Sequence, residues 1–162
     1  LKMMAAAVQK QVGRGDEILK NMNRFAHSSD EAVADIDLNQ TIELVGALTA
    51  RFAALRSVQV DLQLTASSPT ISTAPFFLMN LLCLCLDFSM SASGDEKRVE
   101  IVVEETANSA QIRFRRLADL TEALLETYPS DREKSLLTVL AADLTTAPAD
   151  GEMILRLPKK RE

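Results

Sequence analysis

The sequence is poor in the side chains on which most nucleophilic and metal-dependent catalysis relies. Its 162 residues include one histidine, His27, and two cysteines, Cys83 and Cys85. On a helix, two residues separated by one position point about 200° apart, so these thiols can neither share a metal ion nor form a comfortable disulfide. No nucleophile–base pattern stands out among the Asp, Glu and Ser residues. We therefore expect no hydrolase-type site, and two free thiols favour a reducing, cytoplasmic compartment.

The sequence also lacks an excess of positive charge and a long uninterrupted apolar run. Its net charge is -5 and its isoelectric point is near 5.0, which argues against nucleic acid as a partner because phosphates are neutralised by clustered Lys and Arg. The one basic run, 159–161, is expected to be a solvated tail. The apolar run 75–90 contains Asn80 and Asp87 and is shorter than the ~20 residues of a membrane span. We expect it to form a buried helix, with no membrane insertion in this segment.

The first thirty residues predict a helix with a coiled-coil-like seam. Apolar or small residues recur at alternating spacings of four and three, and with one glutamine the series is Met4, Val8, Gln11, Gly15, Ile18, Met22 and Phe25. Gly13 and Gly15 weaken this helix by roughly 1 kcal/mol each relative to Ala, so we expect a partner helix to support it. No signal-peptide pattern opens the chain, and its start at Leu1 suggests a fragment of a longer protein.

The first half of the remaining chain predicts a helix, a strand and a second helix. Asp37 can cap a helix that runs to about Arg56, with its apolar positions at Ile42, Val45, Leu48, Phe52 and Leu55. The alternation of apolar and polar residues over 58–64 predicts a half-buried strand. Thr73 is expected to cap the next helix, which has Pro75 in its first turn, runs to about Ala92 and is apolar on most sides.

The second half predicts a hairpin, a helix and a final strand. Residues 99–103 and 111–115 read as antiparallel strands. Ser130 and Glu133 form a capping box for a helix, whose apolar face comprises Leu136, Leu137, Val139, Leu140 and Leu144. The turn at 150–151 leads to a last strand, 153–157, that ends before Pro158. This order predicts an α/β (α+β) two-layer sandwich, in which three helices cover one face of a mixed sheet, preceded by the long helix.

Several segments resemble those of bacterial sensor histidine kinases. Residues 16–26 resemble the second helix of the dimerisation hairpin, and residues 36–39 resemble the start of the ATPase domain. The segment 80–87, which begins Asn-Leu-Leu, resembles the asparagine box, usually Asn-Leu-Leu-x-Asn-Ala, and residues 136–158 resemble the closing helix and strand. The resemblance implies a partial dimerisation helix at 1–30, an ATPase-type domain at 31–162, and a homodimer formed through the first helix.

The departures from this family concern the residues that hold ATP and magnesium. Asn80 stands at the first asparagine position, but Leu84 stands at the second, and an apolar side chain cannot coordinate a cation that requires oxygen ligands. Arg116, or Arg115, stands where the family places the Asp that accepts the adenine amino group, and arginine offers only donors. No glycine occurs from 95 to 150, where the family's nucleotide boxes need several. We therefore expect no cofactor, and we interpret Asn80 as the vestige of a degenerate nucleotide site.

The resemblance also suggests a partner and a role. In the family the hairpin helix docks the receiver domain of a response regulator, which makes Lys20, Asn21, Asn23 and Arg24 the candidate partner-binding residues, and we expect all four to be exposed. His27 lies at the far end of this helix and lacks the acidic residue and proline that follow a phosphoacceptor, so we expect an ordinary surface histidine. The leading hypothesis is a two-component signalling protein that acts as a dimeric scaffold or response-regulator-binding module.

Two alternatives remain open from the sequence. One is an active ATP-dependent histidine kinase with a divergent site, which would bind ATP and magnesium and keep Asn80 as its recognisable ligand. The other is a histidine phosphotransferase that reuses a kinase core without nucleotide. The phosphotransferase requires a phosphoacceptor histidine upstream of Leu1.

Overall fold

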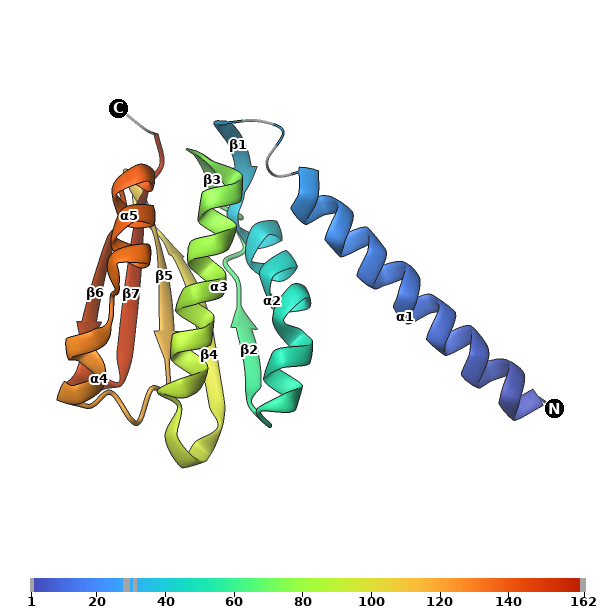
Figure 1. Cartoon of the computed structure of the whole chain (residues 1–162). Helices are drawn as coiled ribbons and strands as arrows, with labels where there is room; N and C mark the ends of the chain where they lie inside the picture. The colour runs from blue at the N-terminus through green and yellow to red at the C-terminus, as the bar shows by residue number, and fades with distance from the viewer. Residues whose placement is uncertain (1, 28–29, 31, 161–162) are drawn as a thin grey trace.

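A five-stranded mixed sheet covered on one face by three helices forms the body of the molecule (Figure 1). The computed structural model describes residues 2–27, 30 and 32–160. The strand order is β2-β4-β5-β7-β6, with β2 parallel to β4 and every other pair antiparallel. The strands are β2 (Gln59–Gln63), β4 (Arg98–Glu105), β5 (Ser109–Arg115), β6 (Asp143–Ala147) and β7 (Glu152–Pro158), and the covering helices are α2 (Leu38–Leu55), α3 (Pro75–Ser91) and α5 (Asp131–Leu140). The predicted two-layer architecture is confirmed.

The long first helix, α1 (Lys2–His27), extends away from this body and contacts it through α2 (Figure 1). The described apolar members of its predicted seam, Met4, Val8 and Met22, are all exposed. The side chains of the other larger seam residues, 11, 18 and 25, lie outside the described part of the chain. Among the described residues, no helix has both the length and the apolarity to cross a membrane.

Local signals placed most helix ends correctly. The Asp37 carboxylate accepts a hydrogen bond from the Gln40 backbone N–H at 3.0 Å, and this bond together with those from the Ser68 hydroxyl lowers the pKa of Asp37. The hairpin β4–β5 has the predicted pairing, in which Val103 lies opposite Ile112. Glu133 accepts from the Ser130 backbone N–H at 3.0 Å and completes the predicted capping box at the start of α5.

Two expected helix residues belong to strands instead. Thr73 does not cap α3: it ends β3 (Thr70–Thr73), which pairs with β1 (Ala34–Asp37), and Ala74 stands at the cap position without a side-chain hydrogen bond. Leu144 is not on the last helix, because α5 ends at Leu140 and Leu144 lies in β6. Ala141 stops the helix by adopting a left-handed conformation, with φ of 52°.

The helix α2 ends as predicted, with Arg56 at its C-cap, but the apolar positions of its last turn are not buried. Ile42 and Val45 are buried and Leu48 is half-buried, whereas Phe52 and Leu55 are 62% and 73% exposed. The last turn of α2 therefore presents large apolar side chains to solvent. The short helix α4 (Glu122–Thr127) and the two short helical turns 94–96 and 148–150 were not predicted either.

The two faces of the sheet differ sharply in character. Alternate residues of the central strands pack against the helices and are buried, among them Val99, Ile101, Ile112, Phe114, Met153 and Leu155. The other face carries ion pairs between neighbouring strands: Arg98–Asp61 at 2.6 Å, Arg113–Glu104 at 2.9 Å and Arg115–Glu152 at 3.1 Å. The charged side chains of the uncovered face are therefore suited to contact with water.

Gly46 in the middle of α2 offers a test of this packing. A Cβ at this position would lie 3.5 Å from Leu62 Cδ1, which is an ordinary van der Waals contact. Alanine also favours a helix interior over glycine, so Gly46→Ala should raise the free energy of unfolding by about 0.5–1 kcal/mol in urea denaturation. The same change at Gly151 should lower it, because that residue has φ of 63° and its Cβ would lie 3.2 Å from the Leu117 carbonyl oxygen. A destabilised Gly46→Ala protein would contradict the described spacing of α2 and β2.

Candidate functional site

Asn80 and Leu84 lie one turn apart on α3 and line a groove that α3 shares with α5. The groove has a volume of about 570 Å³, and its lining comprises Phe76, Phe77, Asn80, Cys83, Leu84, Arg132, Ser135 and Leu136. The Asn80 amide donates a hydrogen bond to the Phe76 carbonyl oxygen of its own helix at 2.7 Å. Burial raises the pKa of the Cys83 thiol, which keeps that thiol neutral. Asn80, the predicted vestige of the nucleotide site, therefore lines a largely apolar groove, and its amide group is hydrogen-bonded to the backbone of its own helix.

Arg116 directs its charge to the other face of the sheet. Its Nε lies 2.8 Å from Glu100 Oε1, and a second guanidinium nitrogen lies 3.4 Å from Glu96 Oε2. Glu100 alternates with Val99 and Ile101, which pack against the helices, so its carboxylate is on the uncovered face. The hydrogen bond with Glu100 raises the pKa of Arg116. The structure therefore does not bring Arg116 together with Asn80 and Leu84.

Arg115, the other residue considered for this position, is also on the uncovered face. It pairs with Glu152, and Arg113 contacts the same carboxylate at 3.1 Å. Neither Arg115 nor Arg116 offers an acceptor for an adenine amino group, since both carry donors only. The structure pairs both guanidinium groups with carboxylates, and neither residue lines the groove beside Asn80.

Tyr128 fills space beside α3 and was missed by the sequence analysis. Its ring stacks on that of Phe88, with centroids 3.8 Å apart and planes 9° apart. Its hydroxyl donates to Cys85 Sγ at 3.5 Å, and burial raises the pKa of Cys85 to about 12 and also raises that of Tyr128. The segment between β5 and α5 thus packs its own aromatic ring against α3. The available signal was that Tyr128 is the only tyrosine of the chain and immediately precedes a proline and the capping box.

The N-terminus of α5 is occupied by an acidic side chain from its own first turn. Glu133 is buried, and it accepts hydrogen bonds from the backbone N–H and the hydroxyl of Ser130. Burial alone would raise the pKa of Glu133, but the hydrogen bonds from Ser130 and the backbone outweigh it and the pKa is lowered. A helix N-terminus can bind phosphate through free N–H groups. Here the Glu133 carboxylate accepts the N–H of the N-cap residue Ser130 and places a negative charge at that end of the helix.

These residues do not fit a magnesium–nucleotide complex. In the described part of the chain, no three His, Cys, Asp or Glu side chains gather closely enough to hold a metal ion. Asn80 has no second oxygen ligand one turn away, because Leu84 stands there, and the negative charge of Glu133 would repel a phosphate at the start of α5. The chemistry of the groove favours apolar contacts over phosphate binding.

The four candidate partner-binding residues on α1 differ in how exposed they are. Lys20, Asn23 and Arg24 are exposed, whereas Asn21 is half-buried. Asn21 faces α2 across a groove of about 800 Å³, which α1 lines with Arg14, Gly15, Glu17 and Asn21 and α2 lines with Ala47, Ala50, Arg51 and Ala54. The prediction that all four residues are exposed is therefore wrong for Asn21. Lys20, Asn23 and Arg24 form the accessible part of the set, which we call the α1 polar patch.

His27 ends α1 as an exposed side chain. Its Nδ1 lies 2.8 Å from Asp30 Oδ2, a contact between neighbours in sequence. Asp30 is itself exposed. This local contact agrees with the expectation of an ordinary surface histidine.

The fold is that of histidine kinase catalytic domains. No protein-family model and no curated protein sequence matches the chain. Among solved structures, it is similar to the catalytic domain of histidine kinase ThkA, with 13% identity and a TM-score of 0.67 over 80% of this chain and 97% of that chain. Histidine kinase AdeS of Acinetobacter baumannii gives 9% identity and a TM-score of 0.66 over 98% of this chain and 85% of that one.

A third similar structure contains a partner. It is histidine kinase ThkA in complex with response regulator protein TrrA, with 14% identity and a TM-score of 0.61. The match covers 94% of this chain and 49% of that chain. At these identities the comparisons establish the fold that the sequence resemblance implied.

The capping box at α5 predicts a specific dependence of stability on pH. Because the pKa of Glu133 is lower in the folded chain than in the unfolded one, its carboxylate stabilises the fold above the unfolded pKa of about 4.3. Glu133→Gln should therefore lower the free energy of unfolding by about 1 kcal/mol near neutral pH. The difference from the unmodified chain should shrink as pH falls below about 4 and through the folded pKa. Urea denaturation at several pH values measures this.

Glu126 on α4 supplies a matched control for that measurement. It is exposed, and Glu126→Gln makes the same change in net charge. The control should alter stability little at any pH. An equal loss for both variants, or a Glu133→Gln deficit that persists unchanged into acid, would contradict the role given to the Glu133 carboxylate.

Proposed function

We propose that this chain is a histidine-kinase-like core with a degenerate nucleotide site, acting in two-component signal transduction as a dimeric scaffold or response-regulator-binding module. One observation carries the proposal. On the fold of a kinase catalytic domain, Leu84 replaces the second asparagine and Arg116 turns away to Glu100 on the opposite face of the sheet. The family's two anchors for magnesium and adenine are therefore absent from the positions that resemble them.

The start of α5 also supports the loss of nucleotide binding. Glu133 places a negative charge there, and this charge would repel a phosphate at that helix end.

Dimerisation through α1 is the second part of the proposal. The helix is 26 residues long, has exposed apolar residues at Met4, Val8 and Met22, and has open space around Gly13 and Gly15. A long amphipathic helix of this kind gains most of its stability by packing against another helix. A second copy of the chain would bury this seam and leave the α1 polar patch accessible.

A response-regulator receiver domain is the proposed partner of the α1 polar patch. Support comes from the similarity to ThkA, which was solved in complex with response regulator protein TrrA, and from the exposure of Lys20, Asn23 and Arg24. Two of these three residues are basic on a chain of net charge -5. They would attract an acidic surface of the partner.

The nucleotide part of the proposal is tested with magnesium-ATP. At millimolar concentration it should neither raise the melting temperature of the chain nor give a calorimetric signal, because a ligand stabilises only a fold that binds it. An active histidine kinase catalytic domain, measured alongside, should respond. Leu84→Asn should not restore binding, since Arg116 and Glu133 are unchanged. A saturable response of the unmodified chain would instead support an active kinase with a divergent site.

The partner-binding part is tested by charge reversal on α1. Lys20→Glu combined with Arg24→Glu should weaken binding of the cognate receiver domain at least about tenfold, as measured by calorimetry or interferometry, because attraction becomes repulsion. Lys2→Glu with Lys10→Glu is the matched control, since both lysines are exposed on the same helix outside the patch. Equal binding by the two double variants would contradict the assignment.

A further inference from the structure

The outer edge of β2 carries unpaired backbone groups. β2 is the first strand in the order of the sheet, and within the described part of the chain it pairs with β4 alone. The Gln59 backbone N–H donates to the Lys97 carbonyl oxygen at 2.8 Å, which places the hydrogen-bonding groups of Gln59 on the β4 side. Because these groups alternate in direction along a parallel strand, Val60 and Leu62 present their N–H and C=O groups to the free edge. An extended chain can pair with such an edge.

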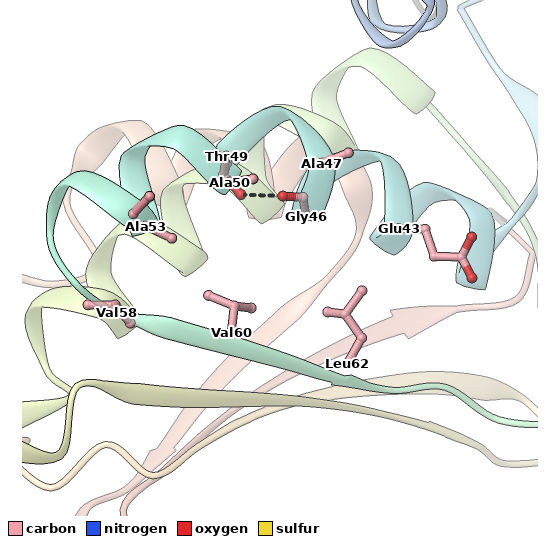
Figure 2. A pocket seen from close by; sticks show the side chains of 10 residues that line it. Glu43, Gly46, Ala47, Thr49, Ala50, Ala53, Val58, Val60 and Leu62 are labelled. Atoms are coloured by element: carbon pink, nitrogen blue, oxygen red, sulfur yellow. Dashed lines mark hydrogen bonds between the residues drawn. The ribbon is translucent and has the colours of Figure 1, made fainter. Parts of the chain in front are cut away.

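A pocket adjoins this edge on the helical side (Figure 2). Val58, Val60 and Leu62 of the β2 region point toward α2 and form the floor. The helix contributes small residues to the lining: Gly46, Ala47, Ala50, Ala53 and Ala54. The volume is about 410 Å³, within the range of ligand pockets of roughly 300–1,000 Å³. The residues that expose the backbone edge therefore also form the floor of the apolar pocket.

An acidic side chain lies at one end of this pocket. Glu43 is the only charged residue in its lining, and Figure 2 shows its carboxylate beyond Leu62, at the end away from Val58. Glu43 is exposed, and its carboxylate makes no hydrogen bond or ion pair with the described residues 2–27, 30 and 32–160. A cationic side chain placed there would gain an ion pair without displacing an existing partner.

We propose that β2 is a docking edge for an extended peptide segment of a partner protein. The segment adds a strand and exchanges backbone hydrogen bonds with Val60 and Leu62. Residues opposite these two point to the same face of the sheet, so small apolar side chains at alternate positions enter the pocket under α2. A Lys or Arg at the Leu62 end meets Glu43. The residues between face the uncovered side of the sheet, beside Asp61, and are polar.

Two short peptides of defined sequence test the proposal on the 162-residue chain. They are acetylated, amidated Lys-Thr-Val-Thr-Val-Thr and its reverse, which place the lysine near Glu43 in an antiparallel or a parallel added strand. One of the two should bind saturably at up to millimolar concentration in a nitrogen-15 NMR titration, with the largest shifts at the amides of Val60 and Leu62. Hydrogen exchange of these two amides should slow in the presence of that peptide.

Three changes in the peptide test, one at a time, its three expected contacts with the protein. N-methylation of the amides that face β2 should weaken binding at least tenfold, since it removes the donors of an added strand. Replacement of both valines by aspartate should have a similar effect through the pocket. Replacement of lysine by glutamine should weaken binding severalfold with the unmodified chain but not with Glu43→Gln, whereas Glu126→Gln should behave like the unmodified chain.

Changes in the protein provide the reciprocal test. Val60→Pro removes one donor from the free edge and leaves the bonds of Gln59 and Asp61 to β4 in place, so peptide binding should be lost. Ala50→Leu fills the pocket from an exposed helix position and should also weaken binding at least tenfold, while Ala123→Leu on α4 is the matched control. Circular dichroism confirms that each variant is folded.

Three outcomes would overturn the proposal. The first is the absence of saturable shifts with either peptide. The second is a set of shifts centred away from β2, or binding that survives both Val60→Pro and Ala50→Leu. The third is that Val60 and Leu62 are already protected from exchange in a dimer that Val60→Pro dissociates, which would show that the occupant of the edge is a second copy of the chain.

Discussion

The packing of α3 against the sheet is the contact on which the rest of the structure depends. Leu78, Leu82 and Leu86 of this helix are buried against a layer that includes Ile112 and Met153, and each such side chain contributes about 1.5–3 kcal/mol when removed from water. Because α3 is apolar on most sides, only a narrow strip around Asn80 and Leu84 is left to line a groove with α5. The position of the candidate site is thus a consequence of how the core is filled.

Two charged residues that bear on this candidate site also have structural roles in the fold. Arg116 follows the end of β5 and joins the ion pairs of the uncovered face through Glu100. Glu133 stands at the first turn of α5 and caps that helix. Both residues therefore have interactions that stabilise the fold. The groove beside Asn80 has Phe76, Phe77 and Leu136 as its large apolar contacts.

The features that could be predicted from the sequence are those that depend on residues close together in the chain. The Asp37 cap, the β4–β5 hairpin and the Ser130–Glu133 box are local patterns, and all three are confirmed. β1 and β3 were missed because each has four residues and gains its hydrogen bonds from a strand more than thirty positions away. Leu144 was assigned to a helix because its spacing fits one, although a left-handed residue at 141 ends that helix first. The replacement at Leu84 was readable from a motif, whereas the stacking of Tyr128 and the partner of Arg116 depend on tertiary contacts.

Beside the groove at Asn80, the described part of the chain offers two further surfaces to a partner. A catalytic domain that transfers phosphate must close around ATP, but a module that binds partners needs only rigid edges at fixed positions. Here α2 lies between two such surfaces, since Ala47, Ala50 and Ala54 line both the groove toward α1 and the pocket above β2. A peptide held at β2 would therefore contact some of the same small residues of α2 that line the groove toward α1. These small residues allow close approach from both directions, and the core beneath α2 holds the helix in place.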